Sequence, residues 1–232
     1  MGPRPVPARL WWLIRVALHQ HPSPNCGPRR DALTPRFVVL HYTAMGSAQA
    51  AIERLSDPAC EVSAHYVICK TGAITQLVGE GARAWHAGAG EWRGLDDMNS
   101  RSIGIELDND GQGPFPEALM HSLETLLKPM LRAWDIPPDH VIGHSDMAPG
   151  RKLDPGPWFD WDRLARQRLA APTPRSREVR APDWDQFRAQ AKSLGYTADA
   201  LDMDLLNAVR LRHRPQGSGP LCAEDMAISH SF

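Results

Sequence analysis

The sequence is poor in the features that mark membrane-spanning and disulfide-rich proteins. It has only 4 cysteines in 232 residues, and none of them forms a C-x-x-C pair, which argues against a structural cysteine zinc site or a disulfide framework. Reduced thiols of this kind favour a reducing compartment. No run of about 20 apolar residues is present, so no membrane span is predicted.

An excess of charge of one sign is also lacking. The 26 lysines and arginines are balanced by 27 aspartates and glutamates, and the formal net charge is -1. This balance gives no electrostatic reason to expect binding to nucleic acid or to an anionic membrane.

Two common hydrolase motifs are missing as well. There is no G-x-S-x-G elbow and no H-E-x-x-H helix. The triplet His144-Ser145-Asp146 cannot replace a serine-hydrolase triad, because adjacent residues point in different directions. Asp146 is therefore interpreted as a residue that shapes its loop or supports its neighbours.

The N-terminal segment 10–18 (LWWLIRVAL) resembles a shortened signal sequence and follows Arg4 and Arg9. Arg15 interrupts its apolar run, and no small-x-small cleavage site follows. We expect a short helix or docking segment within an N-terminal extension, residues 1–23. We also expect a cytoplasmic protein, with the periplasm as the alternative.

The apolar patterns that follow predict a sheet with helices behind it and a cleft in front. Pro129 is expected to kink its helix or to end it early. Residues 79–100 show little periodicity and are predicted to be a long loop, a type of segment that often carries function. The predicted strands are 37–42, 62–68, 73–78, 102–108 and 140–143, and the predicted helices are 47–55, 116–134 and 159–169.

A proline-rich, charged linker, 171–182, divides the main region 24–170 from a C-terminal region, 183–232. Apolar residues at helical spacing predict a helix over 184–194 in this region, with Gly195 as its C-cap. A second helix is predicted over 201–211.

Three residues could form an open zinc site. His41 ends one predicted strand, His144 follows another, and Asp154 lies in the rigid, polar loop 143–156. If the two strands lie side by side, both imidazoles emerge at the same edge of the sheet. Two neutral imidazoles and one carboxylate leave a fourth position on zinc for water.

Two further residues would complete the chemistry of amide hydrolysis. Lys152 and Asp154 project to the same side of an extended segment, so Lys152 could stabilise an oxyanion near the metal. Glu106, on the polar face of its strand, could take a proton from water and pass it to a leaving amine. Each residue alone is more often a packing or surface residue, and only the combination favours catalysis. On composition alone, His65 and His86 are also possible ligands.

Five segments resemble the type 2 N-acetylmuramoyl-L-alanine amidases, and the resemblance extends over residues 24–170. It implies an α/β fold with a mixed central β-sheet flanked by helices, and a zinc site in a groove. It also implies hydrolysis of the amide bond between N-acetylmuramic acid and L-alanine, with a muropeptide or peptidoglycan as substrate, in cell-wall turnover or recycling. The segments are HYTA at 41–44, SAHYVI at 63–68, AWHAG at 84–88, NSRSIGIEL at 99–107 and GHSDMAPGRKLDPGP at 143–157.

By position, the resemblance places the zinc ligands on His41, His144 and Asp154. It places the catalytic glutamate on Glu106 and the catalytic lysine on Lys152. The third ligand is an aspartate, as in the recycling branch, where the phage and recognition-protein branch has a cysteine. The resemblance also implies substrate contacts at Trp85, His86, Asn99 and Arg151, which stand at positions where the family contacts its substrate.

Several alternatives stay open at this point. Ala64 stands where the phage branch has a tyrosine, so zinc, Glu106 and Lys152 must suffice. The region 183–232 is similar to small peptidoglycan-binding modules, but it could equally be an appendage that only packs on the catalytic domain. A cytoplasmic enzyme would meet 1,6-anhydro-muropeptides, the expected substrate, whereas an exported one would meet the intact sacculus. The alternative function is a catalytically silent muropeptide-binding module, against which the intact ligand set argues.

Overall fold

The computed structural model describes residues 18–176 and 180–228. The predicted segment 10–18 therefore lies, apart from Leu18, outside the described residues. No helix within the described ranges is both long enough and apolar enough to cross a membrane.

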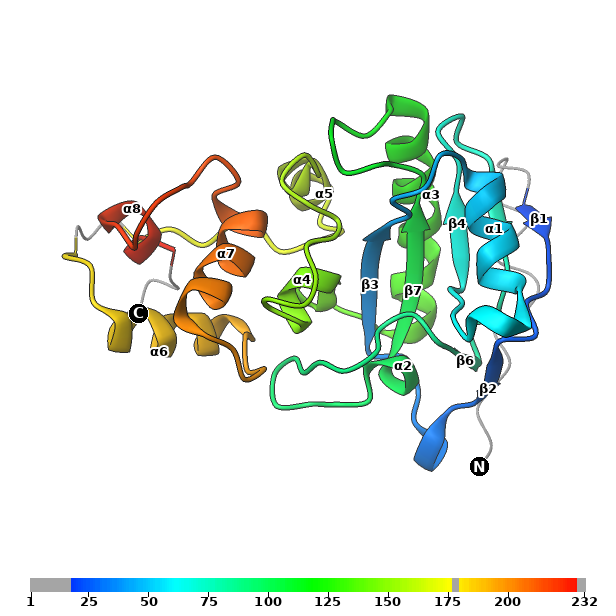
Figure 1. Ribbon diagram of the computed structural model, residues 1–232, viewed down its shortest axis with the longest axis horizontal. Coiled ribbons are helices and arrows are strands. Elements are labelled where there is room, and N and C mark those ends of the chain that lie inside the picture. Colours follow the sequence, from blue (N-terminus) through cyan, green and yellow to red (C-terminus); the bar gives the residue numbers. More distant parts are fainter. Residues whose placement is uncertain (1–17, 177–179, 229–232) are drawn as a thin grey trace.

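A six-stranded mixed sheet, on the right in Figure 1, has the strand order β1-β5-β4-β7-β3-β8. Only the β4–β5 pair is antiparallel, and every other neighbouring pair is parallel. The predicted mixed sheet is thus confirmed. The strands are β1 (Leu18–Gln20), β3 (Phe37–Tyr42), β4 (Tyr66–Ile68), β5 (Ile74–Gln76), β7 (Ser102–Leu107) and β8 (Val141–Gly143). A separate antiparallel pair is made by β2 (Cys26–Pro28) and β6 (Ala82–Ala84).

Strand β3, which lies between β7 and the edge strand β8, is buried on both faces. Val38 and Leu40 belong to the apolar core on one face, whereas Phe37 and Val39 belong to a second core on the other. This division follows from the alternation of side chains along a strand. His41 comes two residues after Val39 and therefore emerges on the second face, at the carboxyl end of the strand.

The long helix α3 (Glu117–Trp134) covers the first face and packs with alternate residues of β7 such as Ile103 and Ile105. It continues five residues beyond Pro129, so the expectation that Pro129 ends the helix early was wrong. Proline removes one backbone donor, but buried residues on both sides of it, including Leu126 and Met130, keep the helix against the sheet.

Shorter elements surround the sheet. Helix α1 (Ala48–Ser56) begins as predicted after Ser47, whose hydroxyl accepts a hydrogen bond from the Ala50 amide. The predicted loop over 79–100 contains only β6 and the start of α2 (Met98–Arg101). The predicted helix over 159–169 is reduced to α5 (Trp161–Arg166). A four-residue helix, α4 (His144–Met147), follows β8 directly. Within the described ranges, 3-10 turns cover Arg30–Ala32, Pro58–Cys60 and Pro138–His140.

The C-terminal region forms α6 (Trp184–Leu194), α7 (Asp202–His213) and α8 (Ala223–Met226), beside α4 and the β8 edge of the sheet (Figure 1). The first two helices and the Gly195 cap agree with the prediction. Their apolar side chains, including Phe187 and Leu206, share one core with Phe37 and Val39 of β3. The second face of the sheet is therefore covered in part by residues from the end of the chain.

Candidate active site

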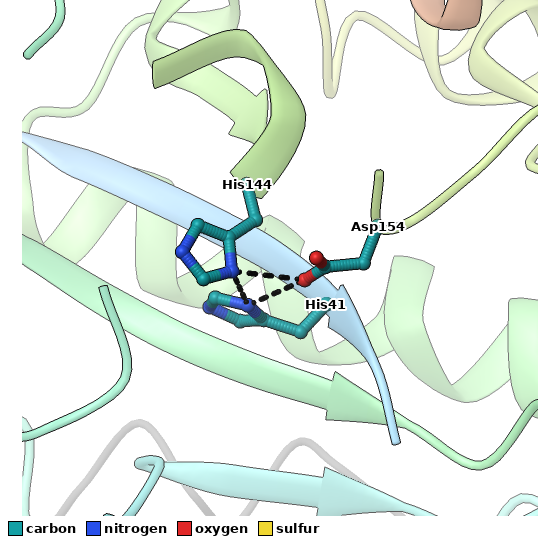
Figure 2. Close-up of side chains that lie close together, drawn as sticks. All are labelled: His41, His144 and Asp154. Carbon is teal, nitrogen blue, oxygen red and sulfur yellow. Dashed lines mark hydrogen bonds and ion pairs between the residues drawn. The ribbon is translucent and has the colours of Figure 1, made fainter. Parts of the chain in front are cut away.

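Two histidines and one aspartate meet at the carboxyl ends of β3 and β8 (Figure 2). These strands pair in parallel, with Leu40 opposite Gly143, so His41 and His144 emerge together at the same edge. His41 Nδ1 lies 2.9 Å from His144 Nδ1 and 2.9 Å from Asp154 Oδ2. His144 Nδ1 lies 3.0 Å from the same oxygen. The three residues singled out as ligands from the sequence thus converge on one point.

The hydrogen bonds around His144 test whether this point suits a cation. Arg151 Nη2 lies 3.3 Å from His144 Nε2, but both of its protons are donated to the carbonyls of Ala87 and Ala89. The Ala87 oxygen, 2.9 Å from His144 Nε2, can only accept, so His144 Nε2 carries the proton of that contact. With Nε2 bound to the carbonyl, Nδ1 is the nitrogen left to face a cation, beside the Asp154 oxygen. Two nitrogens and one oxygen, all within 4.8 Å of one another, match the three protein ligands of an open zinc site.

The protonation states also suit a metal. Burial, and then the neighbouring His144, lower the pKa of His41 to about 4. Burial alone would raise the pKa of Asp154, but hydrogen bonds with His144 and His41 hold it well below its usual range. At neutral pH the group therefore presents a neutral imidazole and an ionised carboxylate, the forms in which these side chains bind metals.

Glu106 lies beside this group because of the register of the sheet. It is directly opposite His41 in the parallel β3–β7 pair. Its Oε2 is buried, and among the described residues it has no hydrogen-bond partner. Burial, followed by the nearby Asp154, raises the pKa of Glu106 well above its usual range, while Lys152 acts in the opposite direction. A carboxylate so poorly solvated is a strong proton acceptor.

A cavity of about 450 Å³ opens over these residues. Trp85, His86, Arg151 and Lys152 line it, as do all three ligand residues and Glu106. Asn99 lies behind the lining, where its side-chain oxygen accepts hydrogen bonds from the amides of His86 and Ala87.

His65 and His86, the two further ligands that composition allowed, are not part of the metal group found among the described residues. Nδ1 of His65 accepts a hydrogen bond from the Gly104 amide instead.

A profile of the family described as N-acetylmuramoyl-L-alanine amidase matches residues 31–157, which is more than half of the chain. The chain belongs to this family. It is accordingly an amidase, and the matched segment lies within the region 24–170 that carries the sequence motifs.

Named relatives of the amidase agree with this assignment. The N-acetylmuramoyl-L-alanine amidase AmiD of Escherichia coli K12 is 38% identical in an alignment of 194 residues that covers 70% of this chain and 69% of AmiD. The 1,6-anhydro-N-acetylmuramyl-L-alanine amidase AmpD of the same strain is 32% identical over 66% of this chain and 92% of AmpD. The solved complex of E. coli AmiD with anhydro-N-acetylmuramic acid-L-Ala-D-gamma-Glu-L-Lys has a TM-score of 0.76 at 32% identity, covering 90% of each chain.

Several residues that contribute to the site of the amidase were not found from the sequence. Ser102 contacts His86, and Tyr196 and Arg212 of the C-terminal region contact Asp146. No recognisable motif marks these residues for a role in the site. Each contacts a partner that is not its neighbour in the sequence, so the contact exists only in the folded chain. Further residues that line the cavity are Tyr42, Thr43, Ala44, Met45, Ala51, Arg54, Leu55, Val62, Ser63 and Leu153.

Asp146 has the loop-shaping role expected for it. Its carboxylate accepts hydrogen bonds from the Gly143 amide at 2.8 Å, the Tyr196 hydroxyl at 2.8 Å and Arg212 Nη1 at 2.9 Å. It lies in α4, the same short helix that begins with His144. The C-terminal region thus supports the element that carries one of the proposed zinc ligands.

Proposed function

We propose that this amidase is zinc-dependent and hydrolyses the amide bond between N-acetylmuramic acid, in its 1,6-anhydro form, and L-alanine during recycling of cell-wall fragments. The observation that carries the proposal is the convergence of three metal-binding atoms in one groove, beside Glu106, whose buried Oε2 has no hydrogen-bond partner in the described part of the chain. The likeness to AmiD, solved with an anhydro-muropeptide substrate, supports the form of the sugar.

His41, His144 and Asp154 would hold the metal. Two imidazole nitrogens and one carboxylate oxygen form a donor set that suits zinc and leaves a position open. When bound there, zinc would supply Lewis-acid polarisation of the amide carbonyl and activation of water.

Glu106 and Lys152 carry the proton transfer and the charge stabilisation in this proposal. Glu106 Oε2 takes a proton from the attacking water and delivers it to the nitrogen of the leaving L-alanine. The ammonium group of Lys152 donates to the oxyanion that develops on the attacked carbonyl. Burial and Asp154 raise the pKa of Glu106, and the same ammonium acts in the opposite direction, so it favours the ionised form that accepts a proton.

The walls of the groove provide the proposed substrate contacts. Trp85 and Arg151 line the cavity and can reach a bound muropeptide directly. His86 lines the cavity as well, from behind His41. Asn99 contributes to substrate binding through the turn that its side chain holds.

Metal removal tests the proposal directly. Treatment with a zinc chelator should abolish release of peptide from an anhydro-muropeptide, measured by liquid chromatography, because the donor set cannot polarise the carbonyl alone. Addition of zinc should restore the activity. Full activity in a sample shown to be metal-free by elemental analysis would overturn the zinc assignment.

Substrate form and compartment need a second experiment. Side-by-side assays on anhydro-muropeptide, reduced muropeptide and whole sacculus should show the highest kcat/KM on the anhydro form. Equal turnover of intact sacculus would contradict a recycling role. Fractionation of cells tests the expected cytoplasmic location against the periplasmic alternative.

A further inference from the structure

The turn at residues 85–88 lies behind both imidazoles of the proposed zinc site. It contacts each ring at the nitrogen that faces away from the converging ligand atoms. His41 Nε2 is 3.0 Å from His86 Nδ1, and His144 Nε2 is 2.9 Å from the Ala87 oxygen. Two consecutive residues, His86 and Ala87, therefore each contact one of the two histidines, on the side away from the proposed metal.

The contact with Ala87 has only one possible direction, since a carbonyl oxygen can only accept. The contact between His41 and His86 could run either way, because each ring nitrogen can donate or accept. Its direction is set further along, at Ser102. The Ser102 hydroxyl lies 2.5 Å from the Met98 carbonyl oxygen and 3.3 Å from His86 Nε2.

The single proton of Ser102 settles the direction of the whole chain of hydrogen bonds. The Met98 oxygen can only accept, so the Ser102 proton points to it, and a lone pair of Ser102 faces His86. His86 Nε2 must therefore be the donor. The ring of His86 is buried, and no contacting carboxylate is present among the described residues to favour its charged form. As a neutral ring it has a lone pair on Nδ1, which accepts the Nε2 proton of His41.

We propose that His86 is a positioning residue, which is anchored through Ser102 on the Met98 carbonyl and holds His41 in the tautomer whose Nδ1 lone pair faces the metal. The Ala87 carbonyl does the same for His144. This inference rests on the proposed zinc site. It deepens that proposal, because it assigns the residues that orient the ligands and select their metal-binding nitrogens.

The packing around His86 keeps its ring in place for this role. The ring lies against Gly104 of β7, where a Cβ atom would overlap it, so the strand leaves the space that the imidazole occupies. Asn99 accepts hydrogen bonds from the amides of both His86 and Ala87, at 2.9 and 2.8 Å. The turn is thus held on its backbone while its side chain and carbonyl orient the ligands.

Nitrogen-15 NMR of the imidazoles in the zinc-loaded, full-length protein tests the assignment without any use of activity. The proposal expects His41, His86 and His144 each to carry the proton on Nε2. Finding zinc on Nε2 of His41, or the proton of His86 on Nδ1, would overturn it. A protein that binds no zinc would contradict the zinc site, whereas a zinc-bound protein with the reversed arrangement would contradict only this inference.

Zinc affinity, measured by competition with a chromogenic chelator, provides the second readout. Loss of a hydrogen-bonding partner of a metal ligand typically weakens metal binding about 10- to 100-fold. We expect such a loss in His86→Leu and a smaller one in Ser102→Ala. His86→Asn, whose side-chain oxygen can replace the Nδ1 acceptor, should recover part of the affinity.

Ser122→Ala is the matched control, since the Ser122 hydroxyl is also buried and donates to a carbonyl, that of Gly72, but from α3. Its zinc affinity should equal that of the wild type. If folded His86→Leu bound zinc as tightly as Ser122→Ala, the positioning role would be refuted. Should a variant fail to fold, the tautomers of the wild type decide the question alone.

Discussion

At the scale of single residues, Glu106 combines a proposed catalytic use with a cost in stability. Its buried Oε2 has no hydrogen-bond partner among the described residues. A buried polar atom without a partner costs about 1–3 kcal/mol, and a charged one costs more. The position is therefore unfavourable for folding but suits a proton acceptor, which must not be stabilised in its ionised form by strong hydrogen bonds.

Replacement of Glu106 by glutamine should separate these two effects. In the zinc-bound protein, Glu106→Gln should lower kcat by about 10²- to 10⁴-fold, the usual contribution of a general acid–base residue. Muropeptide binding, measured by calorimetry, should remain. Glu53→Gln, on the exposed side of α1, is the control and should keep full activity. Normal turnover by Glu106→Gln would refute the assignment of the base.

The pH dependence of stability gives a second prediction for the same variant. The pKa of Glu106 is raised in the folded protein, so above the pKa of the unfolded chain the unfolded state releases a proton that the folded state keeps. Stability is therefore lost as pH rises above that value. In zinc-free protein, Glu106→Gln should have a higher Tm than the wild type at pH 7–8, and the difference should vanish near pH 4. A constant difference across this range, in scanning calorimetry, would contradict the raised pKa.

The convergence of the proposed ligand residues could be predicted from the sequence, whereas most of the residues that we propose to orient them could not. His41, His144 and Asp154 stand out because their residue types and places beside strand ends match a known donor set. Ser102 carries no such mark, since its role depends on one proton and on a carbonyl in the preceding turn. Information of this kind exists only once the chain has folded.

At the scale of elements, local patterns were sufficient to predict three features. A continuous apolar run with branched residues predicted β3, alternation predicted β7, and a glycine at the turn, Gly72, predicted the β4–β5 hairpin. The capping residues Ser47 and Gly195 were equally informative, because they act on their own backbone. The early end expected at Pro129 was wrong, since burial on both sides of the residue outweighs one lost hydrogen bond. Local signals thus predicted local structure, and tertiary packing decided the remainder.

Helix α4 and the loop that follows it depend on a buried ion pair. Arg212 donates to Asp146 and to the Val141 carbonyl, and its guanidinium lies 4.0 Å from the ring centre of Trp161. Removal of one partner of a buried pair leaves an uncompensated charge and costs about 3–5 kcal/mol. Because α4 begins with His144, the geometry of the proposed zinc site depends on this pair.

Arg212→Met should therefore lower the free energy of unfolding by about 3–5 kcal/mol in urea titrations, and it should also weaken zinc binding. Arg188→Met is the control, because Arg188 pairs with Asp185 and Asp202 at the surface. Exposed pairs contribute about 0–1 kcal/mol. Equal stability of the two variants would show that the buried pair does not support the loop.

At the scale of the whole molecule, the C-terminal region and the sheet share an apolar core. Phe187 and Leu206 from the helices, Met147 from α4, and Phe37 and Val39 from β3 belong to the same cluster. The sequence favoured neither packing nor wall binding for this region, because an apolar helix face does not specify its partner. The packing is observed, and it makes the region part of the support of the active site.

A shared core predicts a single unfolding transition. Phe187→Ala should destabilise the whole molecule by about 3–5 kcal/mol, which lowers the Tm by on the order of 10 °C for a chain of this size. Leu201→Ala, at an exposed position of the same region, should change stability by less than about 0.5 kcal/mol. Two separate transitions in calorimetry, of which Phe187→Ala shifts only one, would contradict a common core.

The pairing of His41 with Glu106 across β3 and β7 also has a consequence for folding kinetics. The two residues are opposite each other only in one register of a parallel pair, and a slip by one residue would turn Glu106 to the other face. Parallel pairing between segments so distant in sequence forms slowly. During refolding, enzymatic activity should therefore return with the final ordering of the sheet, later than the helical circular-dichroism signal.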